Sequence, residues 1–102
     1  MNNLYKRYIF RKFKKEAKSK YRVLQINENT YEIQVYVDVG INVSMMQWSP
    51  ILIDKLNKTS TKDDYKKVCD ELRQSYYNKL VNEFNVSESK KELRKKYPKV
   101  IY

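Results

Sequence analysis

The sequence predicts an α+β fold with an N-terminal helix, an antiparallel sheet of two to three strands, and two to three C-terminal helices. Apolar residues recur every four positions near the N-terminus and at every odd position from 31 to 45. These are the spacings of a helix and of a half-buried strand, and the helical spacing returns beyond residue 60. With 102 residues, of which 41% are hydrophobic, the chain has the size and apolar content of one compact domain.

Residues 3–19 are expected to form a helix with two unlike faces. One face stacks apolar residues that lie four positions apart: Tyr5, Ile9, Phe13 and Ala17. The other side gathers cations: Arg7, Arg11, Lys14, Lys15 and Lys18. Like charges at this spacing repel, and only Glu16 offsets them, so the pattern favours a phosphate-binding face over a merely solvated one. It also suits a helix on an anionic membrane, but the strands that follow indicate a folded domain.

The sheet is expected to follow directly. A first strand over residues 21–26 leads into a hairpin loop at 27–29, where Asn tolerates a positive φ. The alternation over 31–45 predicts a second strand and, after a turn at the only glycine, Gly40, a third strand that ends by residue 46. Tyr36 lies on the polar face, where a tyrosine either stacks on a nucleic-acid base or covers a neighbouring side chain.

Helices are expected over three further ranges: 50–57, 61–84 and 89–97. Ser49 and Pro50 are a helix-start signal. Ser60 or Thr61 can cap the second helix, and the Ser-Lys-Lys-Glu that begins at Ser89 resembles a capping box for the third. The last helix is expected to stop before Pro98.

The longest of these helices carries an apolar stripe that suits a core: Tyr65, Val68, Cys69, Leu72, Tyr76 and Leu80. Further apolar residues widen the stripe, and this surplus can pack the last helix or meet a partner chain. The candidate partner-interface residues are Tyr76, Tyr77 and Phe84. Because Cys69 lies within the stripe, it is expected to be an inert buried thiol.

The net charge of +10 is concentrated at the two ends of the chain. Residues 1–22 carry nine Lys and Arg against one acid, residues 87–102 carry six against two, and residues 23–57 carry one against four. The expected last helix supplies a second set of cations, as a nucleic-acid contact or a solvated tail: Lys90, Lys91, Arg94, Lys95 and Lys96. Such asymmetry indicates an anionic partner.

The composition excludes several kinds of chemistry. Without histidine and with a single cysteine, the chain can form neither a Cys/His zinc site nor an internal disulfide, and it lacks imidazole for catalysis. One glycine rules out a Gly-rich phosphate loop. The neighbouring acids Asp63/Asp64 and Asp70/Glu71 fit a helix surface. We therefore expect no enzyme, no metal and no cofactor.

The first functional hypothesis is a small protein that binds DNA or RNA through electrostatic contacts to phosphates, made by both sets of cations. The second is an interaction module or inhibitor that docks on an acidic surface of a host or replication protein. A homodimer through the aromatic helix face is a third. No membrane span or secretory signal is recognised, so a cytoplasmic protein is expected. The Lys-, Asn-, Ile- and Tyr-rich composition suits a phage or mobile element.

Overall fold

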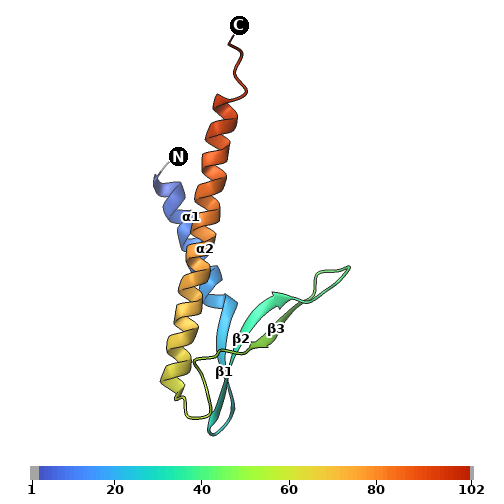
Figure 1. Ribbon diagram of the computed structural model, residues 1–102, viewed down its shortest axis with the longest axis vertical. Helices are drawn as coiled ribbons and strands as arrows, with labels where there is room; N and C mark the ends of the chain where they lie inside the picture. Colours follow the sequence, from blue (N-terminus) through green and yellow to red (C-terminus); the bar gives the residue numbers. More distant parts are fainter. Residues whose placement is uncertain (1–2, 102) are drawn as a thin grey trace.

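The computed structural model describes residues 3–101 and shows a helix, a three-stranded sheet and one long helix (Figure 1). In chain order the elements are α1 (Asn3–Lys20), β1 (Tyr21–Asn27), β2 (Thr30–Asp38), β3 (Met46–Ile51) and α2 (Lys62–Lys96). The predicted α+β class, the N-terminal helix and the antiparallel sheet are confirmed. The prediction of two to three helices after the sheet is wrong, since the structure described up to residue 101 has the single helix α2 there.

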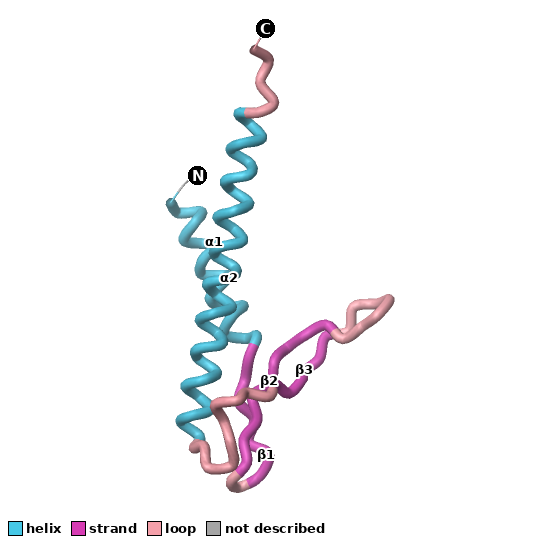
Figure 2. Tube along the Cα trace, in the orientation of Figure 1, coloured by secondary structure: helices cyan, strands magenta, loops and turns pink. Residues whose placement is uncertain are grey.

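The molecule is elongated. It measures 72 × 35 × 24 Å and its radius of gyration is 19.3 Å, whereas a globular chain of this length has a radius of about 13 Å. α1 and α2 run antiparallel as a helical arm, and the sheet lies at the end of the arm where α2 begins (Figure 1). The connection between β2 and β3 projects sideways from both (Figure 2).

The core lies between the sheet and the first half of α2. The strands pair antiparallel in the order β1-β2-β3, so that Val23, Ile33 and Ile51 lie side by side across the sheet. Ile33 is only 1% exposed and packs with Val68 and Cys69 of α2. The odd-numbered face of the sheet therefore covers the expected apolar stripe of the long helix.

Aromatic side chains join α1 to α2. The ring of Phe84 meets those of Phe10 and Phe13 edge-on at centroid distances of 5.7 and 6.0 Å. One turn nearer the sheet Ala17 is buried, and the Tyr76 hydroxyl donates a hydrogen bond to Glu16 at 3.3 Å. The aromatic surplus of the long helix, including Tyr76 and Phe84, is thus used at this contact.

The helix expected over residues 50–57 is absent, and its start signal belongs to β3. Ser49 pairs with Val35 and Pro50 with Gln34 in the antiparallel ladder. β3 is an edge strand, and proline is tolerated there because one side of the strand needs no N–H donor. Residues 52–61 form turns that lead to α2, with the Leu56 N–H bonded to the Ile53 carbonyl.

The helices expected over 61–84 and 89–97 are a single helix. Of the two expected caps, Ser60 and Thr61, it is Thr61 that caps the helix, with a full capping box to Asp64. The similar motif at Ser89 lies inside the helix, because residues 85–88 contain no Gly or Pro to stop propagation. α2 ends at Lys96, two residues before Pro98, so the expected stop is confirmed.

The third strand exists, but it lies later than the sequence predicts. Residues 39–45 form a tight loop, here called the finger, and β3 begins only at Met46. A Cβ on Gly40 would lie 1.7 Å from the Val43 carbonyl oxygen, so only glycine fits at this close approach. The other hairpin, at Glu28 and Asn29, needs no positive φ, contrary to expectation.

Candidate nucleic-acid interface

The cations of α1 form one exposed strip, here called the cationic strip. At 100° per residue the five lie within about 100° of the helix circumference and extend about 16 Å along the axis: Arg7, Arg11, Lys14, Lys15 and Lys18. All five side chains are exposed. Within residues 3–101 none of them makes an ion pair. The strip therefore presents unneutralised charge to solvent.

The strip is held in place by the opposite face of α1. Like charges at i,i+4 destabilise an isolated helix by a few tenths of a kcal/mol per pair, and a helix of 18 residues is marginal on its own. Contacts of Phe10, Phe13 and Ala17 with α2 supply the compensating burial. Packing against α2 thus stabilises the helix that carries the cations.

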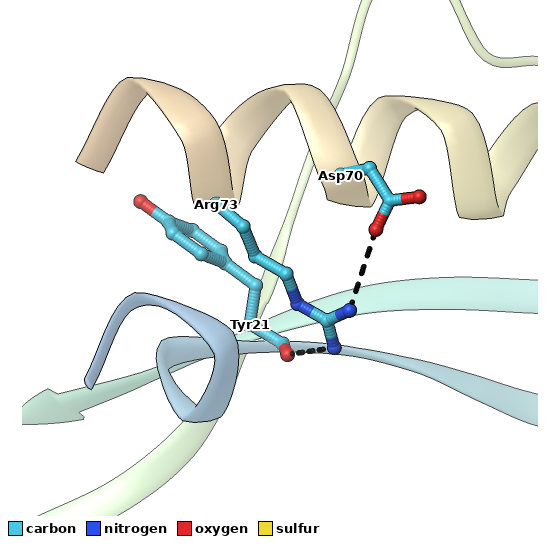
Figure 3. A network of polar contacts seen from close by, with 3 residues as sticks. All are labelled: Tyr21, Asp70 and Arg73. Atoms are coloured by element: carbon cyan, nitrogen blue, oxygen red, sulfur yellow. Dashed lines mark hydrogen bonds and ion pairs between the residues drawn. The ribbon is translucent and has the colours of Figure 1, made fainter. Parts of the chain in front are cut away.

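One edge of the strip borders a groove between the two helices. Lys14 and Lys18 line this groove, of about 370 Å³, together with Asp70 and Tyr77 of α2. Arg73 also lines the groove; it donates a hydrogen bond from Nη2 to the Tyr21 carbonyl at 2.8 Å and pairs with Asp70 at 3.4 Å (Figure 3).

Arg73 fixes the junction of α1 and β1 against α2. Its Nε is buried and, within the described residues, has no hydrogen-bond partner. Sequence reasoning missed this residue. Arg73 directly follows Leu72, a residue of the apolar stripe. This position indicates a side chain at the edge of a core contact.

The second set of cations is spread around the end of α2. The five side chains are exposed, but at 100° per residue they span about 240° of the circumference: Lys90, Lys91, Arg94, Lys95 and Lys96. Lys91 also pairs with Glu88 at 3.3 Å. Only some of these cations can therefore share a side with the cationic strip.

Tyr36 belongs to an aromatic cluster on the sheet face turned away from α2. Its ring packs against Trp48 at a centroid distance of 5.1 Å, and the Arg22 guanidinium lies 4.1 Å from the Trp48 centroid. Gln34 accepts a hydrogen bond from Arg22 Nε at 2.7 Å and donates one to Glu32. Tyr36 thus covers a neighbouring ring while 38% of it stays exposed.

Base stacking by Tyr36 remains a prediction. Sequence reasoning missed Arg22, Gln34 and Trp48 as members of the cluster. Recognising residues 46–51 as a strand would have placed Trp48 opposite Tyr36 in the ladder.

Cys69 is chemically quiet. It is 2% exposed, and burial raises the pKa of its thiol, with Arg73 opposing and Asp70 adding to the shift. The thiol is therefore protonated at neutral pH and is a poor nucleophile. Within residues 3–101 no cluster of three or more Cys, Asp and Glu side chains has the geometry to hold a metal ion.

No protein-family model matches the chain, and neither the curated proteins nor the solved structures include a significant match to it. Of the helices described over residues 3–101, neither α1 nor α2 combines the length and apolar character needed to cross a bilayer.

Proposed function

We propose that the protein binds nucleic acid, with the cationic strip of α1 lying along the phosphate backbone. The observation that carries the proposal is the strip itself, five exposed cations on one helix that packs against α2, none of them in an ion pair with any residue of the described range 3–101. A surface that served only solubility would interleave both signs, because like charges at i,i+4 repel. Phosphates supply the missing counter-charge and release bound counterions when they do so.

The cations at the end of α2 contribute to the field that attracts the polyanion. Their spread around the helix does not suit one continuous contact, so the strip on α1 is expected to set the position on the backbone. Contacts of this kind carry no sequence information. The protein is accordingly proposed to bind nucleic acids of different sequence with similar affinity.

A filter-binding titration over a range of salt concentrations tests the proposal. If each of the five strip cations neutralises one phosphate of duplex DNA, log affinity falls by about 4 to 5 units per tenfold rise in salt. The double reversal Arg11→Glu/Lys14→Glu should lower this slope by about 2 and weaken binding at least tenfold at low salt.

The matched control is Lys62→Glu/Lys79→Glu, which changes the net charge equally at two exposed positions of α2. It should weaken binding less than the strip reversal. Equal losses in the two variants would show that net charge alone attracts the nucleic acid and would contradict the proposal. Equal affinity for poly-glutamate at matched salt would favour an acidic protein surface as the partner of the strip.

A further inference from the structure

The finger exposes apolar side chains to an unusual degree. Ile41 is 96% exposed, Val43 78% and Met45 58%. Exposed apolar groups that occur singly are ordinary, but a contiguous set on a projection marks a contact site. Figure 1 shows the finger reaching away from both helices, and within the described residues 3–101 these side chains are exposed.

The finger is also held in one shape. The Asp38 carboxylate accepts hydrogen bonds from the N–H groups of Gly40 and Met45 and from the Ser44 hydroxyl, each at 2.9 Å. The Val39 N–H donates to the Met45 carbonyl at 2.9 Å. A contact through this loop therefore loses little conformational entropy on binding.

A complementary surface lies at the other end of β3. A cavity of about 350 Å³, here called the hollow, opens between the β1–β2 hairpin and the segment after β3. Its lining is largely apolar and includes Ile26, Tyr31, Leu52, Ile53, Leu56 and Tyr65. Leu52 at its rim is 98% exposed. Because β3 has six residues, the finger and the hollow lie about 20 Å apart. The finger of one chain therefore cannot enter the hollow of the same chain.

The presence of both apolar surfaces in one chain favours a second copy of this chain as the occupant, and charge does not oppose it. The protein carries a net charge of +10, so two copies repel, yet no Lys or Arg occurs between Arg22 and Lys55. The finger carries no charged side chain, and Glu32 is the one charged residue among those that line the hollow in the described part of the chain, so neither surface carries the cations through which two copies repel. The same absence of cations disfavours phosphates or anionic lipids as the occupant.

We propose that two copies form a two-fold dimer across β3 in which each finger enters the hollow of the other. β3 is the edge strand of the sheet, with the finger before it and the hollow after it. Two such edges side by side and antiparallel bring each finger to the opposite hollow, which is the reciprocal contact that two-fold symmetry requires. Pro50 lacks an N–H, so side chains carry more of the contact than a backbone ladder does.

Light scattering of nuclease-treated full-length protein at high salt tests the dimer. High salt screens the repulsion and removes bound polyanion, so the result is independent of the proposed nucleic-acid binding. The wild type should approach the mass of a dimer as its concentration rises. Ile41→Asp in the finger and Leu52→Asp in the hollow should each raise the dimer Kd roughly 30-fold or more.

Val100→Asp is the matched control, since Val100 is apolar, 91% exposed and beyond the end of α2. It should leave the dimer Kd unchanged. All three positions are almost fully exposed, and circular dichroism checks that each variant keeps its fold. A wild type that stays monomeric up to its solubility limit, or a Kd that only Val100→Asp raises, would overturn the proposal.

Cross-linking then tests the reciprocal contact. A mixture of Ile41→Cys and Leu52→Cys chains should form a heterodimer with a short bismaleimide, since the native Cys69 is buried. An Ile41→Cys and Val100→Cys mixture should not. Equal yields from the two mixtures would refute the placement of the finger in the hollow.

Discussion

The helical arm and the sheet end of this molecule differ in exposed charge and in buried core. The helical arm carries the cationic strip and the cations at the end of α2, and its interior is a single layer of contacts such as Phe10–Phe84. The sheet end contains Ile33, Val68 and Cys69, the buried cluster of the fold.

The difference follows from solvation. An exposed cation keeps its hydration free energy, whereas burying a cation without a partner costs several kcal/mol. Repelling cations are therefore tolerated on a thin arm that water surrounds, whereas the buried cluster at the sheet end, as described over residues 3–101, contains no Lys or Arg. Substitutions that change the charge of the arm should therefore have small effects on the free energy of unfolding. Substitutions that change the packing of the sheet end should have larger ones.

The sharpest contrast is the same substitution made in the core and in the finger. Ile33→Ala removes a side chain that is 1% exposed and should lower the free energy of unfolding by about 2–5 kcal/mol. Ile41→Ala, at a side chain that is 96% exposed, should change it by less than about 0.5 kcal/mol. Urea denaturation of dilute, monomeric protein measures both. Similar losses at the two positions would show that the finger is packed in solution.

A second substitution separates the arm from the sheet. Phe84→Ala removes the half-buried ring that joins α1 to α2 and should lower the free energy of unfolding by about 2 kcal/mol. Because α1 is marginal alone, its amide protons should exchange faster while those of β2 stay protected. Val86→Ala, at an exposed position one half-turn on, is the control and should leave α1 protected. Uniform loss of protection in α1 and β2 would show that the arm and the sheet unfold as one unit.

Two capping motifs give the next contrast. Thr61 caps α2 through its side chain, so Thr61→Ala should lower the free energy of unfolding by about 1 kcal/mol. Ser89 begins a similar motif inside the helix, where alanine is the better helix former. Ser89→Ala should therefore be neutral or stabilising by up to about 0.5 kcal/mol. A loss at Ser89 as large as that at Thr61 would mean that α2 is broken in solution near residue 88.

These motifs show where sequence reasoning succeeds. The helix at 3–19 was predictable because its apolar and cationic residues both follow a helical period over four turns. A cap at Ser60 or Thr61 was predictable because a loop precedes the helix there. Ser89 has the same chemistry, but whether it caps depends on whether the preceding turn ends, and no local signal ends it there.

The sheet shows where sequence reasoning fails. The alternation from Tyr31 to Met45 continues past Asp38, although only the first half forms a strand. The chain departs at Asp38 because its carboxylate binds the loop amides of Gly40 and Met45, a contact that no period reveals. The helix predicted at Pro50 failed for a related reason. Proline at a strand edge and proline in a first helical turn look alike until the pairing of β3 with β2 is known.

Acid should loosen the finger before it affects the core. The N–H of Met45, then that of Gly40, then the Ser44 hydroxyl lower the pKa of Asp38 below its ordinary value. A carboxyl group whose pKa is lowered by folding stabilises the fold above its unfolded pKa, and this contribution is lost as pH falls through the folded pKa. The Gly40 and Met45 amide resonances should therefore titrate together, with a midpoint below that of a free aspartate.

Compared with the substitutions in the core, the protonation of Asp38 should have the smallest effect on the free energy of unfolding. The linked loss in the free energy of unfolding should be small, because a single exposed carboxyl group supplies it, and urea midpoints measure it. Asp38→Asn should abolish the amide titration, whereas Asp54→Asn, at an exposed aspartate outside the finger, should preserve it. A midpoint at or above that of free aspartate would mean that the loop amides do not bind the carboxylate in solution. The finger would then have no fixed shape, although its side chains would still be exposed.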